Sequence, residues 1–102
     1  MKDFYQGDII KISGFGNLFL IISKNVFIRE RKMFHVSPIV NTDIINPMNI
    51  DIKGVDGTEG TVICEEIKLI DPVARACTKV DRINYWGIIN ISDAIQGMFE
   101  YD

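Results

Sequence analysis

The chain has 102 residues, of which 47% are hydrophobic and 25% are charged, and its net charge is −3. This composition is ordinary for a globular protein, and the length predicts one domain spanning residues 1–102. No apolar run approaches the roughly 20 residues that cross a bilayer, and the first residues lack a signal-peptide pattern, so we expect no membrane segment and a cytoplasmic location. The negative net charge argues against an extensive nucleic-acid surface but permits a local basic patch.

Residues suited to metal or cofactor binding are few. Two cysteines, Cys64 and Cys77, and a single histidine, His35, do not support a zinc site. The glycine-rich segment 54–60 has no lysine, serine or threonine at the spacing of a phosphate-binding loop. We therefore expect no metal and no cofactor, and we expect Cys64 to be buried and unreactive because it follows a β-branched apolar run.

Short apolar or alternating segments predict strands along most of the chain. Glycine-rich or polar turns separate them, and Pro38 implies a sheet edge, a bulge or the last residues of the strand that contains it. The basic cluster at residues 29–32 is predicted to lie in a loop or at a hairpin tip. The predicted strands are residues 9–12, 18–23, 33–40, 48–53, 61–64 and 67–70.

The tail of the chain predicts a helix. Asn84 is a suitable N-cap, and an apolar stripe recurs at steps of three and four residues. We interpret Trp86 as part of the core packing of this helix. The predicted fold is therefore mainly β with a C-terminal helix, either a small SH3-like barrel or a twisted antiparallel sheet. The stripe consists of Ile88, Ile91, Ile95 and Met98.

Five segments of the chain together suggest a known family. They are GDII at 7–10, LIIS at 20–23, VSPIV at 36–40, GTVICEEIKLID at 60–71 and VARACTK at 73–79. These segments resemble the MazF/PemK family, and the related CcdB-like proteins, among the toxins of type II toxin–antitoxin systems. This resemblance implies a homodimer that is neutralised by a cognate antitoxin, with single-stranded RNA as a possible substrate and endoribonuclease as the activity.

The chain departs from this family where the resemblance would place catalysis. The ribonucleases carry an arginine just before their second strand and a threonine just after the Pro-x of their third strand, whereas this chain has Asn17 and Val40 there. The preceding loop, which brings substrate-binding residues to the site, is cut to residues 13–17. Losing one preorganised charge stabiliser costs about 100- to 1,000-fold in rate, so we expect ribonuclease activity to be absent or very weak.

Other side chains remain candidates for catalysis or binding. His35 is the only side chain whose ordinary pKa lies near neutrality, so it is a possible general acid or base, although a strand histidine is more often a hydrogen-bonded sheet residue. Arg75 is a second weak catalytic candidate. The basic residues predicted to bind RNA or an acidic antitoxin segment are Arg29, Arg31, Lys32, Arg75 and Lys79.

Three functions remain open at this point. The protein is a toxin-like growth inhibitor, a catalytically silent relative that serves as a binding or regulatory protein of a phage or mobile element, or an unrelated SH3-like interaction domain. Growth arrest on expression separates the first two functions. The absence of an adjacent antitoxin gene favours the third.

Overall fold

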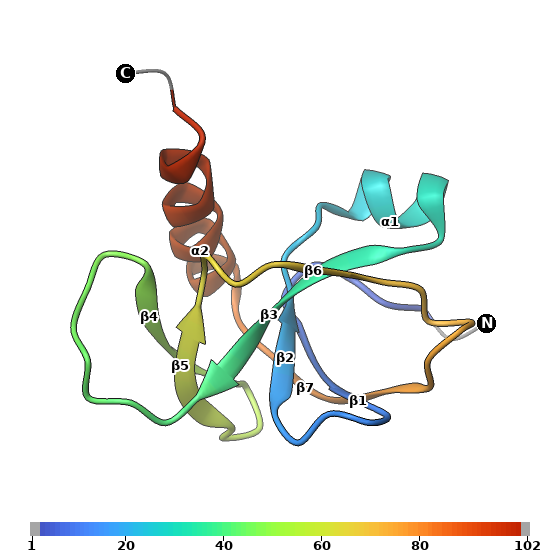
Figure 1. Cartoon of the computed structure of the whole chain (residues 1–102), viewed down its shortest axis with the longest axis horizontal. Coiled ribbons are helices and arrows are strands. Elements are labelled where there is room, and N and C mark those ends of the chain that lie inside the picture. Colours follow the sequence, from blue (N-terminus) through green and yellow to red (C-terminus); the bar gives the residue numbers. More distant parts are fainter. Residues whose placement is uncertain (1–2, 101–102) are drawn as a thin grey trace.

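The computed structural model describes residues 3–100 and contains one antiparallel sheet and two helices (Figure 1). Strands follow one another in the sheet in the order β4-β5-β3-β2-β1-β7, and β6 pairs with the first part of β3. The elements are β1 Asp8–Ile12, β2 Leu18–Ile21, α1 Asn25–Arg31, β3 Phe34–Val40, β4 Asn49–Lys53, β5 Glu59–Ile63, β6 Lys68–Ile70, β7 Cys77–Arg82 and α2 Tyr85–Met98.

The predicted class, mainly β with a C-terminal helix, is confirmed in its twisted-sheet form. Within residues 3–100, the outer strands β4 and β7 do not pair with each other, so the sheet does not close into a barrel. None of the helices in that range is long and apolar enough to span a membrane.

The two faces of the central strands each carry a hydrophobic cluster, because successive side chains of a strand point to opposite faces. The first cluster includes residues of α1 and β6, and the second includes residues of β4, β5 and α2. The first comprises Phe4, Ile10, Ile12, Phe19, Ile21, Ile28, Phe34, Val36 and Ile70. The second comprises Ile9, Leu20, Ile39, Ile52, Val62, Cys64, Ile83 and Ile91.

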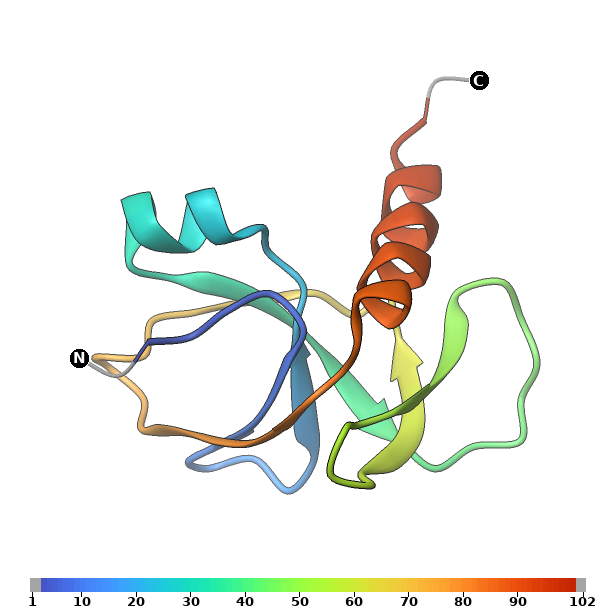
Figure 2. The same ribbon diagram turned by 180° about the vertical axis from the view of Figure 1, so that it is seen from behind.

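Helix α2 begins where the sequence predicts. The Asn84 side chain accepts a hydrogen bond from the backbone N–H of Gly87 at 2.8 Å. Ile91 is buried, and the first turn packs closely on Gly7, since a Cβ at Gly7 would lie 2.6 Å from Ile88 Cδ1. Gly7 also has a φ of 91°, which a side chain would disfavour. The C-terminal half of the helix projects beyond the sheet (Figures 1 and 2).

Three details differ from the sequence-based expectations. The basic cluster lies on a helix, α1, rather than in a loop, and β7 was not predicted. Trp86 is 71% exposed rather than part of the core, because it lies on the outer side of the first turn of α2. The strand β7 pairs only with β1 and exposes most of its side chains, so its sequence lacks the apolar alternation of a half-buried strand.

Asp81 lies on β7, one outer strand of the sheet, and binds the turn between β4 and β5 at the opposite edge. Its Oδ1 accepts the N–H of Asp56 at 3.0 Å, and its Oδ2 accepts the N–H of Thr58 at 3.1 Å. A side chain at Gly54 would collide with this carboxylate, which explains the glycine. A hydrogen bond from the Thr58 side chain is the largest cause that lowers the pKa of Asp81, and burial raises this pKa. The backbone N–H groups of Arg82, Asp56 and Thr58 lower it further, so the pKa falls to about 2.

We expect Asp81→Asn to remove part of the acid sensitivity of the fold. A carboxyl group with a depressed folded-state pKa stabilises the protein fully above its ordinary value of 3.8, and the contribution is lost as the pH falls toward about 2. Urea unfolding between pH 5 and pH 2 should therefore show the wild type and the variant converging in free energy of unfolding. The matched control is Asp56→Asn in the same turn. A wild-type advantage that stays constant over this pH range would contradict the role of Asp81.

Candidate functional site

Asn17 and Val40, the positions where the sequence resemblance implies catalysis, lie at the same end of the sheet. Leu18 pairs with Ile39 in the β2–β3 ladder, so the next position in the antiparallel register places Asn17 opposite Val40. Val40 also pairs with Thr61 of β5, whose hydroxyl donates to Asp51 Oδ1 at 2.7 Å. The structure thus brings the two positions together, but neither side chain carries a positive charge.

An acidic hollow of about 520 Å³ adjoins this end of the sheet. It is lined by the carboxylates of Asp43, Asp51 and Glu59 and by one cation, Lys53. The Lys53 ammonium lies 3.8 Å from Glu59, so its charge is already partly balanced. A phosphate approaching from this side meets net negative charge, which is the reverse of what phosphodiester chemistry requires.

His35 lies on the opposite face of β3 from Val40. Its backbone N–H donates to Ser23 Oγ at 2.6 Å, and the same hydroxyl lies 2.7 Å from His35 Nδ1. The hydroxyl can donate to a neutral imidazole or accept from a protonated one. The ring also packs on Phe27 of α1, with centroids 5.0 Å apart. This geometry fits a hydrogen-bonded sheet residue that joins the end of β2 to β3.

Arg75 lies over the shortened loop between β1 and β2. Its guanidinium carbon is 5.0 Å from the centroid of Phe15, and Lys68 Nζ is 5.9 Å from the same centroid. Phe15 packs edge-on against Phe19, on the face of β2 that also carries Asn17 by alternation. Two cations therefore lie beside the Asn17 end of the sheet, and His35 lies on the other face.

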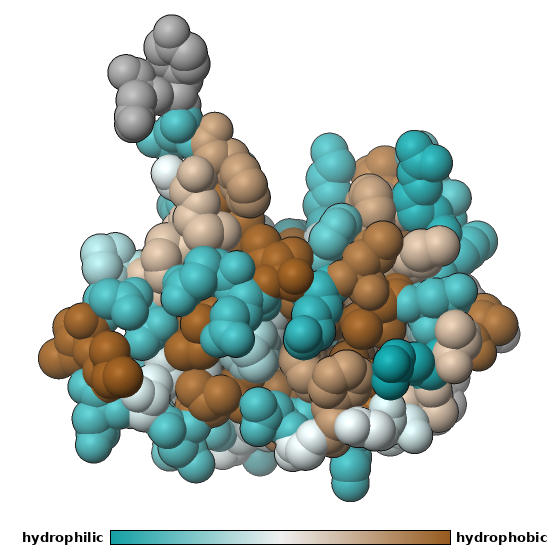
Figure 3. Space-filling model, in the orientation of Figure 1, coloured by the Kyte–Doolittle hydropathy of each residue, from teal (hydrophilic) through white to brown (hydrophobic). Residues whose placement is uncertain are grey.

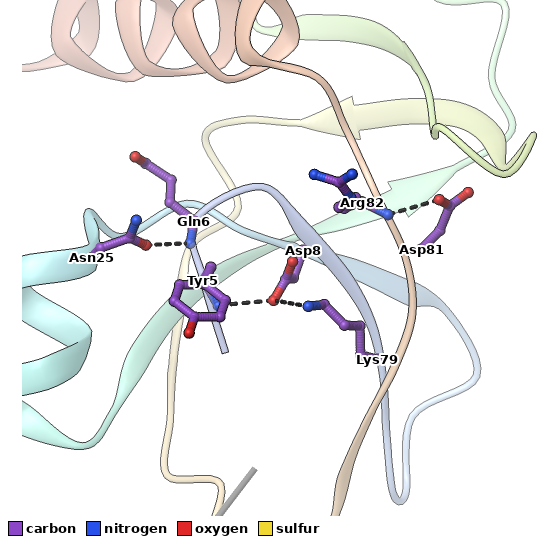
Figure 4. A network of polar contacts seen from close by, with 7 residues as sticks. All are labelled: Tyr5, Gln6, Asp8, Asn25, Lys79, Asp81 and Arg82. Carbon is purple, nitrogen blue, oxygen red and sulfur yellow. Dashed lines mark hydrogen bonds and ion pairs between the residues drawn. The ribbon is translucent and has the colours of Figure 1, made fainter. Parts of the chain in front are cut away.

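Lys79 is engaged within the protein. Its Nζ lies 3.2 Å from Asp8 Oδ2 and 5.5 Å from the ring centroid of Tyr5 (Figure 4). The same Asp8 oxygen accepts the backbone N–H of Tyr5 at 2.8 Å. Lys79 therefore holds the N-terminal segment against β7, which leaves it less available to a ligand than the sequence suggests.

The basic residues of α1 divide into two groups. Arg29 and Lys32 line a hollow beneath the helix, and Arg31 does not. Lys32 ends α1 in the left-handed conformation with a φ of 58°, where glycine or asparagine is usual, and its N–H donates to the Ile28 carbonyl. The structure thus separates residues that the sequence presents as one cluster.

Cys64 is buried, as the sequence predicts, and its environment is that of an unreactive thiol. Burial raises the pKa of that thiol to about 11, with a smaller contribution from Glu65. Burial also raises the pKa of Cys77. In the part of the chain that the structure describes, no three His, Cys, Asp or Glu side chains gather as a metal-binding group.

The sequence did not predict the aromatic partners of Arg75 and Lys79, nor the carboxylate of Asp51 near Val40. Phe15 and Tyr5 lie far along the chain from the cations above them, so only the folded structure brings each pair together. Asp51 was detectable, because it lies on the polar side of an alternating strand. No local pattern, however, indicates that this strand pairs with β5, which in turn pairs with the end of β3.

Comparison with solved structures identifies the fold, whereas the comparisons with family profiles and curated sequences find no match. The chain matches no protein-family profile and no curated protein sequence. Among solved structures, it is similar to a chain of the MazE–MazF complex (Form-I) of Deinococcus radiodurans, with a TM-score of 0.83 and 11% identity over 96% of this chain and 97% of that chain. An endoribonuclease in complex with its cognate antitoxin, from a mycobacterial species, gives a TM-score of 0.82 and 15% identity over 98% and 100%.

A further endoribonuclease from a mycobacterial species gives a TM-score of 0.81 at 15% identity over 95% of this chain and 91% of that chain. These matches cover nearly the full length of each chain. The protein therefore has the fold of the MazF toxins, in agreement with the resemblance noted in its sequence.

Proposed function

We propose that this protein is the toxin component of a toxin–antitoxin pair and that it inhibits growth without the ribonuclease site of the enzymes it resembles. The observation that carries this proposal is the fold, which matches a MazF chain over 96% of its length and extends to the terminal helix. An antitoxin partner is supported by two of the similar structures, which are complexes with MazE and with a cognate antitoxin.

The geometry around Asn17 and Val40 supports a silent ribonuclease site. Asparagine carries no charge to stabilise a phosphodiester transition state, and valine has no hydrogen-bond donor. Asp51 lies in the same neighbourhood through its bond to Thr61. His35 offers no substitute at this position because it lies on the other face of β3.

Purified protein without antitoxin should not cut single-stranded RNA that covers all short sequence motifs, with no metal added. The expected result is no sequence-specific cleavage with multiple turnover, because the charge stabiliser is missing. Arg75→Ala and His35→Ala test whether the site was rebuilt. Cleavage that is abolished by either substitution would contradict a silent site.

Induced expression of the chain should arrest bacterial growth, and co-expression of the gene that precedes it should restore growth and yield a stable complex. Arrest follows from the toxin role, whereas a regulator alone leaves growth unchanged. The second candidate function, a silent binding or regulatory protein, is favoured by the same absence of a positive charge at Asn17 and of a hydroxyl at Val40. Unimpaired growth, with retained binding to a partner, would establish that candidate instead.

We also propose that the protein is a homodimer. Helix α2 and the residue that follows it expose large aromatic side chains, with Tyr85 69%, Trp86 71% and Phe99 75% exposed, and the C-terminal half of the helix stands away from the sheet. Covering such surface stabilises association, and self-complementary two-fold dimers are the commonest solution. Sedimentation at micromolar concentration should give a dimer. A species of 11.6 kDa alone would exclude it.

A further inference from the structure

The segment between β3 and β4 carries apolar side chains that the described part of the chain leaves uncovered. Ile45 is 97% exposed, and Ile44 beside it is 69% exposed. Figure 3 shows a hydrophobic projection where this segment lies, at one end of the longest axis of the molecule. Single exposed apolar residues are ordinary on a protein surface, but two adjacent isoleucines on a projecting segment favour an interaction site.

Polar side chains of the same segment brace it. Thr42 Oγ1 accepts the N–H of Ile44 at 3.1 Å, and the Asn49 side chain donates to the Ile44 carbonyl at 3.0 Å. Asn46 Oδ1 accepts the N–H of Met48 at 2.8 Å. A segment that is already ordered loses little conformational entropy on binding, so these bonds favour association through the isoleucines.

A hollow of about 340 Å³ beneath α1 has the complementary surface, with an apolar floor and a basic rim. Phe4 and Phe34 form the floor, with ring centroids 5.3 Å apart, and Ile28 of α1 also lines it. Arg29 and Lys32 lie at the rim. The volume is at the lower end of the range for ligand pockets, roughly 300–1,000 Å³, so it suits one or two aliphatic side chains.

The charges of the two surfaces are opposite. Asp43 precedes the isoleucines and lines the acidic hollow at the β4–β5 end of the sheet. Within residues 3–100, no ion pair involves Arg29, Lys32 or Asp43. Asp3 also lines the hollow beneath α1, which leaves one positive charge in excess there. An acidic apolar segment is therefore attracted to this hollow, whereas a basic one is repelled.

The two surfaces lie too far apart to meet within one chain. The segment between β3 and β4 is at one end of the longest axis, and α1 lies toward the other end (Figures 1 and 2). The molecule measures 36 Å along this axis. A second copy of the chain can bring the two surfaces together, because each copy presents both of them.

We propose that residues 41–48 of one copy dock in the hollow beneath α1 of a second copy. Ile45 packs on the phenylalanine floor, and Asp43 pairs with the two cations of the rim. The contact joins two different surfaces, so it is separate from the proposed two-fold dimer through α2. It is also independent of the toxin role.

The test mixes two variants of the full chain, each of which keeps one half of the contact. ¹⁵N-labelled Ile45→Ser keeps the hollow, and unlabelled Arg29→Glu combined with Lys32→Glu keeps the docking segment. Adding the unlabelled chain to roughly 1 mM should shift the labelled amides around the hollow, a concentration chosen because small interfaces are weak. High salt should reduce these shifts, because the charge pairs are exposed.

Matched changes in the unlabelled chain separate this contact from diffuse attraction. Adding Ile45→Ser should weaken binding about tenfold or more, because an isoleucine is no longer buried. Val55→Ser removes an exposed apolar side chain from the turn between β4 and β5 and should change affinity less than about twofold. Asp43→Lys should weaken binding, and placing Arg29→Glu and Lys32→Glu in the labelled chain as well should restore it.

Three results would overturn the inference. They are an absence of shifts at the hollow, equal losses from Val55→Ser and Ile45→Ser, and loss of the shifts when both chains carry Trp86→Ser, which would assign the association to α2. Dispersed amide spectra show that each variant is folded. The toxin role is tested by growth, so either result can fail while the other stands.

Discussion

The alternation of side chains along β3 is the constraint on which the rest of the structure depends. Phe34 and Val36 point into one hydrophobic cluster, and Ile39 points into the other. Because β3 pairs with β2, β5 and β6, its register fixes the position of most of the sheet. The same alternation puts Val40 and His35 on opposite faces, which keeps the imidazole away from the end of the sheet where the sequence resemblance implies catalysis.

The open sheet is held together at its ends by polar contacts. Asp81 binds the turn between β4 and β5, and the N–H of Val55 donates to the Arg82 carbonyl at 2.8 Å. Lys79 holds the N-terminal segment through Asp8 and Tyr5. The second contact engages the charge of Lys79, which the sequence analysis assigns to ligand binding. The other predicted binding residues are the basic residues of α1 and Arg75, which lies above Phe15.

The sequence predicted the sheet and the terminal helix because both depend on local periodicity. Asn84 and the stripe through Ile91 carry a helical signal that tertiary packing reinforces. The short helix α1 was missed because its inward face is polar, which removes the apolar stripe that identifies a helix. The prediction that Trp86 packs in the core was wrong, because periodicity does not show which side of the first turn of α2 packs against the sheet. Candidate residues were found individually, but their grouping around Phe15 and beneath α1 depends on contacts between distant segments.

The central claim is that a MazF fold with Asn17 and Val40 at the sheet end acts without cleaving RNA. The most direct measurement is mapping of RNA 5′ ends in cells during induced expression of the chain, compared with cells expressing an active MazF enzyme. We predict that growth stops while no new 5′ ends accumulate at a recurring short motif. New ends at such a motif, lost when Arg75 is replaced by alanine, would contradict the account.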